Sequence, residues 1–182
     1  GEQVPFENFF HVFENKILQI GMVLPLLDSW CDPGYTKRLW CTLELAIVKQ
    51  KAIPFEILLP PAQTESFQMA LRTTNLECMD IFWESLGSIK VEMARAFCQE
   101  DKLQDVIGRR ATHEELDETV QTALRHWFCD CLEAQALLAY ASDSPHIYDS
   151  ASVALRKFGQ THRVINLIEK RLEHEVEYIR NL

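Results

Sequence analysis

Apolar residues follow two different patterns over the first 61 positions of the chain. In the opening segment, residues 4–16, phenylalanines recur at helical spacing and form one aromatic face: Phe6, Phe9, Phe10 and Phe13. Residues 17–26 and 53–59 are instead apolar runs, which are typical of strands covered on both faces. Between these runs, Thr36 can cap a helix that reaches about Lys51. A strand, a helix and a strand joined by short links predict a βαβ unit with two parallel strands.

No strand pattern follows Pro61, and the rest of the chain predicts helices. Short helices are expected in four places: residues 64–73, 75–87 (where the pattern is ambiguous), 91–98 and 100–109. The sequence Thr112-His113-Glu114-Glu115 is a capping box that opens a helix to about Ala141. Pro145 and Gly159 precede two more helices, the last with an apolar stripe. We therefore predict an α/β fold that is mostly helical, with a partial βαβ unit at residues 1–61 and an α-helical extension at residues 62–182.

Composition and charge restrict the functional classes. The 182 residues are 47% hydrophobic and 25% charged, as in an ordinary globular domain. A formal net charge of -9 argues against nucleic-acid binding, which needs clustered Lys and Arg. No apolar run reaches the roughly 18 residues of a membrane-spanning helix. We therefore expect protein partners and no nucleic acid, and any association with a membrane-attached complex would be peripheral.

The cysteine pattern indicates reduced thiols. Six cysteines are present and none forms a Cys-x-x-Cys pair. Cys129 and Cys131 fall two residues apart in a predicted helix, where their side chains point in different directions and cannot easily share a metal or a disulfide. We expect an intracellular, reducing compartment, the cytoplasm in the first place, with an organelle as the alternative. The histidines show no ligand spacing, so no metal site is expected.

The segment from Met22 to Pro60 carries a recognisable set of motifs. An apolar run, Met22-Val23-Leu24-Pro25-Leu26-Leu27, leads into a loop with Ser29-Trp30. The helix start Leu39-Trp40-Cys41-Thr42-Leu43-Glu44-Leu45 follows, and then a second apolar run containing Pro54. These parts resemble the second half of a Toll/interleukin-1 receptor (TIR) domain. With the helical region from Ile89 to Trp127, the chain is most similar to divergent TIR-like modules of unicellular algae.

The resemblance implies two possible activities. Many TIR domains are assembly modules that pair with other proteins, whereas others are enzymes that cleave NAD. In the enzymes the glutamate of this motif is catalytic, and Glu44 holds that position here. Its carboxylate would stabilise the positive charge that develops as the glycosidic bond of NAD, the substrate, breaks. No other cofactor is implied.

Each candidate residue also has a structural interpretation. Glu44 can lie on the helix flank beside a basic side chain, or be stabilised by the positive helix N-terminus. The side chains that could line a ligand site share a position near the carboxyl end of the first predicted strand or the start of the following helix: Asp28, Ser29, Trp30, Trp40 and Cys41. Asp28 and Ser29 are equally typical of a turn. Trp40 and Cys41 can simply fill space between helix and sheet.

The first half of a TIR domain has no counterpart in the residues that precede the first predicted strand, since only residues 1–16 lie there. So small a sheet leaves its edges exposed. We therefore expect a non-catalytic scaffold subunit that docks on other proteins, with the aromatic face of Phe6, Phe9, Phe10 and Phe13 and the amphipathic last helix as contact surfaces. The alternatives are an NAD glycohydrolase that uses Glu44, and a peripheral accessory subunit of a membrane-attached complex.

Overall fold

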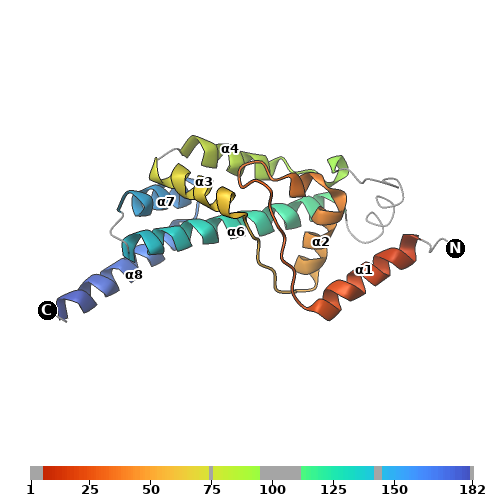
Figure 1. Ribbon diagram of the computed structural model, residues 1–182, viewed down its shortest axis with the longest axis horizontal. Coiled ribbons are helices and arrows are strands. Elements are labelled where there is room, and N and C mark those ends of the chain that lie inside the picture. Colours follow the sequence, from red (N-terminus) through yellow and green to blue (C-terminus); the bar gives the residue numbers. More distant parts are fainter. Residues whose placement is uncertain (1–5, 74–75, 95–111, 142–144, 181–182) are drawn as a thin grey trace.

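The computed structural model describes residues 6–73, 76–94, 112–141 and 145–180. Seven α-helices and two short 3-10 helices, η1 and η2, make up its regular structure. Figure 1 shows an elongated molecule in which the long helix α6 runs through the middle and the two chain ends lie at opposite extremes. The prediction of a mostly helical chain is confirmed. No regular β-strand is present within these described ranges.

The first helix, α1 (Phe6–Ile20), is longer than predicted. It absorbs the start of the apolar run at residues 17–26, so the strand predicted there is wrong for residues 17–20. Gly21 ends the helix with a positive φ of 73°, and its N–H donates to the carbonyl of Ile17 at 3.0 Å. Glycine adopts this left-handed conformation without a Cβ clash, which makes it a common helix terminator.

The two extended segments that follow are paired in parallel, but only through isolated bridges. Val23 pairs with Phe55 and Leu26 pairs with Leu58. Four backbone hydrogen bonds of 2.8–3.1 Å join the segments. The ladder would next require N–H donors from Pro25 and Pro60, which have none. The predicted parallel pairing is therefore present, while the prolines prevent regular strands.

The link between these segments contains η1 (Gly34–Lys37) and α2 (Leu39–Gln50). Thr36 does not cap α2 as predicted, because its hydroxyl donates to the carbonyl of Pro33 at 2.8 Å. Arg38 occupies the N-cap position instead, without a side-chain capping bond. The helix ends at Gln50, and two residues later Ala52 adopts a positive φ of 52°, after which Ile53 N–H donates to the carbonyl of Val48 at 2.9 Å.

Most helices of the second part match the sequence signals, but the helix predicted at residues 91–98 is wrong at its start, where a 3-10 turn ends at Met93 and Ala94 is extended; residues 95–98 lie outside the described part. The helices of this part are α3 (Pro61–Arg72), α4 (Leu76–Gly87), η2 (Val91–Met93), α6 (His113–Ala141), α7 (Pro145–Lys157) and α8 (Thr161–Arg180). The capping box is confirmed: Glu115 N–H donates to Thr112 Oγ1 at 3.1 Å, and Thr112 N–H donates to Glu115 Oε2 at 2.8 Å. The helix predicted at residues 100–109 lies outside the described residues.

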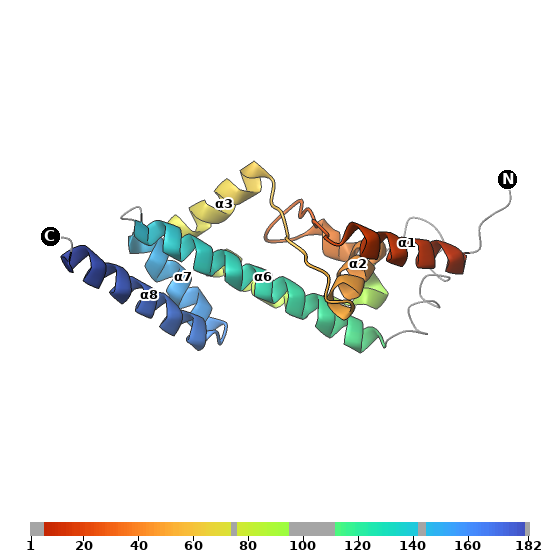
Figure 2. The same cartoon turned by 90° about the horizontal axis from the view of Figure 1, so that it is seen from below.

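Two hydrophobic clusters hold the helices together. The larger one joins α3, α4, α6 and α7 around Phe82 and Phe128, whose ring centroids lie 4.7 Å apart. It also takes in Leu27 and Ile57 from the paired segments, so it contains residues from both predicted units. The smaller cluster packs α1 and α2 against the start of α6 around Phe10. Figure 2 shows α1 and α2 at one end of α6 and α7 and α8 at the other.

Candidate functional site

Glu44, the residue that the TIR resemblance marks as catalytic, lies half-buried on α2. Tyr35 of η1 donates a hydrogen bond from its hydroxyl to Glu44 Oε2 at 2.5 Å. Burial is the main cause that raises the pKa of Tyr35 far above its usual range, and the bond to Glu44 adds to it. Tyr35 therefore stays a neutral donor. A catalytic role for Glu44 stays a prediction, and its carboxylate is already engaged by this contact.

Cys41 lies one helical turn before Glu44. Its side chain is half-buried, and burial raises the pKa of its thiol above the ordinary value. Arg38 opposes this shift and Glu44 adds to it, but both effects are smaller than that of burial. Because the thiolate is the nucleophilic form of cysteine, this environment does not activate Cys41.

Asp28 and Ser29 organise the loop that follows the first extended segment. Asp28 Oδ1 accepts the backbone N–H of Gly34 at 2.8 Å, and Ser29 Oγ accepts the N–H of Asp32 at 3.3 Å. A Cβ at position 34 would come within 2.8 Å of Asp28 Oδ2, so this close approach requires glycine unless Asp28 moves. These are the turn-forming contacts that the alternative interpretation of Asp28 and Ser29 expects.

The two tryptophans pack between elements. Trp30 is buried; its indole Nε1–H donates to Ser66 Oγ at 3.2 Å, and its ring meets Phe67 edge to face. Trp40 is half-buried and meets Phe13 of α1 edge to face, with centroids 5.5 Å apart. Together these contacts fix the loop against α3 and fix α1 against α2. None of the six residues proposed for catalysis or ligand binding lines the cavities described below.

The aromatic face proposed as a partner surface is in part internal. Phe10 is buried in the smaller core cluster, and Phe13 is half-buried against Trp40. Phe10 is therefore not available to a partner, and only part of the Phe13 side chain is. The side chains of Phe6 and Phe9 lie outside the described part of the structure, so the proposal stays a prediction for them.

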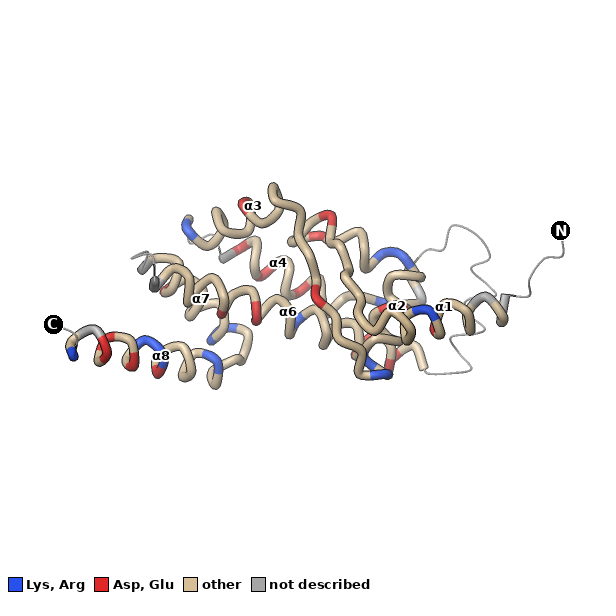
Figure 3. The backbone as a smooth tube through the Cα atoms, turned by 60° about the horizontal axis from the view of Figure 1, so that its bottom comes forward, with Lys and Arg blue, Asp and Glu red and all other residues tan. Residues whose placement is uncertain are grey.

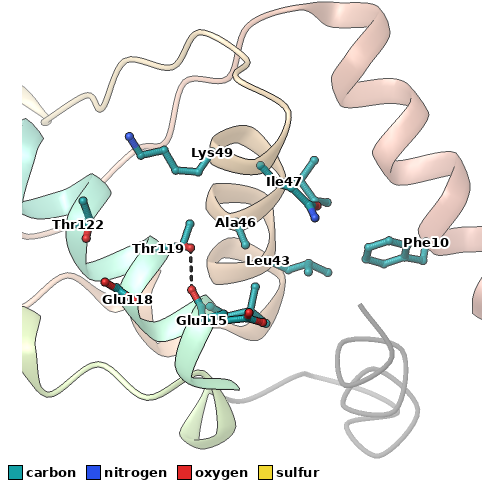
Figure 4. A pocket seen from close by; sticks show the side chains of 11 residues that line it. Phe10, Leu43, Ala46, Ile47, Lys49, Glu115, Glu118, Thr119 and Thr122 are labelled. Atoms are coloured by element: carbon teal, nitrogen blue, oxygen red, sulfur yellow. Dashed lines mark hydrogen bonds between the residues drawn. The ribbon is translucent and has the colours of Figure 1, made fainter. Parts of the chain in front are cut away.

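The largest cavity described lies between α2 and the first turns of α6, with Phe10 of α1 at one end (Figure 4). Its volume is about 680 Å³, within the range of small-molecule sites. The floor is apolar, with Phe10, Leu43 and Ile47, whereas Glu118 and Lys49 lie at its rim. Two smaller cavities, of about 190 and 210 Å³, lie beside η2 and between Trp83 and His126.

Within the described residues, no group of three or more His, Cys, Asp or Glu could hold a metal ion.

The paired extended segments expose an apolar face that the sequence predicted to be covered. Side chains alternate strictly along the first segment: Val23 and Leu27 are buried, whereas Met22, Leu24 and Leu26 are 42–59% exposed. Leu58, the partner of Leu26 in the second bridge, is also exposed. The prediction that this run is covered on both faces is therefore wrong for its outer face.

The outer edge of the first segment is open as well. In a parallel ladder, alternate residues direct their N–H and C=O groups to opposite sides. Val23, Pro25 and Leu27 bond to the second segment, which leaves the backbone groups of Leu24 and Leu26 facing away from it. These two residues make no hydrogen bond within the described part of the chain. An apolar face and an open edge thus occur together, a combination that natural proteins usually cover.

The last helix presents a second exposed apolar surface. The residues of its outer stripe are Ile165, Ile168, Leu172, Val176 and Ile179. The sequence assigned these residues to the apolar face of the helix, together with Val164. The structure separates them: Val164 is half-buried toward the body of the molecule, and the other five face outward.

In comparisons with known proteins, no protein-family model, no curated protein and no solved structure matches this chain.

None of the described helices is both long and apolar enough to cross a membrane. The five described cysteines, Cys31, Cys41, Cys78, Cys129 and Cys131, are free thiols; Cys98 lies outside the described residues. The compartment stays a prediction.

Proposed function

We propose that this chain is a non-catalytic, TIR-like interaction subunit that docks on another protein through the open edge of its paired segments. The observation that carries this proposal is the mismatch between sequence and burial at residues 22–27. The run is apolar on both faces, but the structure covers only one of them. Large exposed apolar surfaces on soluble proteins commonly mark interaction sites.

The open edge suggests how the partner would bind. An extended segment laid beside residues 22–27 can pair with the outward backbone groups of Leu24 and Leu26, and apolar side chains at alternate positions can cover the exposed leucines. Main-chain hydrogen bonds would give affinity, and the apolar contacts would give specificity. The TIR resemblance supports this proposal, because a complete domain of that family continues its sheet beyond two strands.

The NAD glycohydrolase alternative receives less support from the geometry. Glu44 is bonded to Tyr35, and Glu44 lines none of the three cavities described. A catalytic carboxylate must reach the reacting sugar, so either Tyr35 would have to release it or the substrate would have to share it. The two functions are separated by incubating the chain with NAD and measuring nicotinamide release. We expect no nicotinamide release. Release that is lost in the Glu44→Gln variant would show that the chain is an enzyme.

The interaction itself is tested by site-specific photo-cross-linking. Benzoylphenylalanine is placed at Leu24 and, as a control on a different surface, at the exposed Met69 of α3. Irradiation of cells that produce the protein should give a discrete protein adduct from position 24 and not from position 69. Adding Leu26→Glu should suppress the adduct. Equal adducts from both positions, or none from position 24, would refute the proposed docking edge.

A further inference from the structure

The inner face of α8 is firmly attached to the body of the molecule. Leu167 is fully buried in the main core. Arg163 reaches Asp130 at 2.5 Å and Glu133 at 3.2 Å, and Lys170 reaches Glu133 at 3.3 Å. Because these contacts fix the rotation of α8 about its axis, they also fix which side of the helix faces outward.

The outward side is a continuous apolar stripe. Ile165, Ile168, Leu172, Val176 and Ile179 follow one another at intervals of three or four residues, so they fall within a sector of about 100° around the helix. Their exposed fractions lie between 47% and 68%. The C-terminal half of α8 extends beyond the ends of α6 and α7, where no other described element covers it (Figures 1 and 2). The stripe therefore has the spacing of a helix–helix contact surface but lacks a second helix.

The charged residues on either side of the stripe indicate which kind of partner could cover it. On one border, Glu169 and Glu173 are exposed and make no ion pair within the described part of the chain; Arg180, seven residues after Glu173, is the basic residue at the far end of this border. They lie four residues apart, an arrangement in which like charges destabilise a helix. On the other border, Glu175 is already paired with Arg171 at 3.0 Å. Figure 3 shows both acidic and basic positions along α8.

A second copy of the chain fits this surface poorly. In an antiparallel pair of α8 helices the same borders meet, which would bring Glu169 of one copy close to Glu173 of the other. Each copy also carries a formal net charge of -9, which adds to the repulsion. An anionic membrane surface would meet the same two glutamates, and the formal net charge of -9 would add to the repulsion.

We infer that the outer stripe of α8 binds an amphipathic helix of a partner protein whose apolar face is bordered by Lys or Arg. The apolar side chains would interdigitate with Ile168, Leu172 and Val176, and the basic border would lie beside Glu169 and Glu173. This surface is separate from the edge at residues 22–27, so the inference does not depend on the proposed function. A variant at Leu24 should leave binding at α8 unchanged.

Two synthetic 21-residue helical peptides provide the probe. Both carry the same leucine stripe; one has Lys at every position that borders it and the other has Glu. Fluorescence anisotropy of the labelled peptides is measured with the full chain in 0.15 M salt. We expect the Lys peptide to bind at least tenfold more tightly than the Glu peptide. The combined variant Glu169→Lys and Glu173→Lys should reverse this preference.

Leu172→Asp should abolish binding of the Lys peptide, whereas Ile81→Asp, at an equally exposed position on α4, should not change it. Circular dichroism confirms that each variant keeps its helices. Equal affinity for the two peptides, or binding that is insensitive to Leu172→Asp, would overturn the inference. Two other results would also overturn it, if Leu172→Asp abolishes them. One is self-association of the chain in sedimentation velocity, and the other is binding to phosphatidylcholine vesicles with or without phosphatidylglycerol.

Discussion

The hydroxyl of Tyr35 donates a 2.5 Å hydrogen bond to Oε2 of Glu44, and this contact joins η1 to α2. Tyr35 is buried and Glu44 is half-buried, so the bond is shielded in part from water. It makes Glu44 a structural acceptor in the folded chain, whatever further role its carboxylate has. The contact also lies beside the loop that Asp28 and Ser29 organise, so it helps to fix the connection between the two extended segments.

Removing this donor should weaken the fold measurably. Tyr35→Phe leaves the ring in place but deletes the bond to a charged acceptor, and we expect the free energy of unfolding to fall by about 1–2 kcal/mol. Urea denaturation measures the change. In a double-mutant cycle with Glu44→Gln, the effect of Tyr35→Phe should shrink because the acceptor has lost its charge. An undiminished effect in the Gln background would show that the ring, not the bond, is responsible.

The backbone at Ala52 offers a stabilising substitution. Ala52 adopts a positive φ of 52° at the end of α2, a conformation that costs an L-residue about 1 kcal/mol. Ala52→Gly should therefore stabilise the chain by about 0.5–1 kcal/mol. Gly159, at φ 74° after α7, is the reverse control, and Gly159→Ala should destabilise by a similar amount. Thermal or urea denaturation measures whether each substitution raises or lowers the free energy of unfolding. Destabilisation by Ala52→Gly would refute this explanation.

Asp117 connects α6 to η2 through two hydrogen bonds. Its Oδ1 accepts Val91 N–H at 2.7 Å, and its Oδ2 accepts from Lys90 Nζ at 3.0 Å. Because Asp117 and Val91 are buried, Asp117→Ala leaves an unsatisfied N–H and should cost about 2–3 kcal/mol. Lys90→Met removes the half-exposed partner, keeps the backbone bond, and should cost less than about 1 kcal/mol. Similar losses for both variants would mean that the ion pair, not the backbone bond, dominates.

Two thiols, of the buried Cys129 and the half-buried Cys131, predict how stability depends on alkaline pH. Burial raises the pKa of Cys129 to about 11 and that of Cys131 to about 12, from an ordinary 9.0. The unfolded chain releases these protons near pH 9, whereas the folded chain keeps them. The contribution of these two thiols to the free energy of unfolding should therefore be constant below that pH and be lost as the pH rises through 10 and 11. Urea denaturation at several pH values across this range measures the loss. In the double variant Cys129→Ala, Cys131→Ala, the free energy of unfolding should fall less steeply with pH.

Local signals made the second part of the fold predictable from sequence. The capping box at Thr112 and Glu115, Pro145 at the start of α7 and Gly159 after its end each specify a helix boundary through contacts within a few residues. Packing between helices that are far apart in the sequence was harder to predict. The buried side of α6 changes along its length, as it leaves α2 and meets α7 and α8. Leu138, predicted to lie on the inner stripe, is consequently exposed.

The extended segments show why an apolar run is ambiguous. Residues 17–20 have no periodicity that separates a buried strand from a helix, and α1 continues through them. Gly21 was the available signal for the helix end. Pro25 and Pro60 were equally visible as residues that break a hydrogen-bond ladder. The Tyr35–Glu44 contact had no such signal, because it depends on how η1 turns back toward α2.

Hydrogen exchange of the isolated chain, followed by NMR, tests the open edge without any knowledge of the partner. The amides of Leu27 and Leu58, which donate across the paired segments at 3.0 and 2.8 Å, should be protected. The amides of Leu24 and Leu26, which face away from that pairing, should exchange close to the rate of an unstructured peptide. If Leu24 and Leu26 are instead as protected as Leu58, the edge is already covered and the proposed docking surface does not exist.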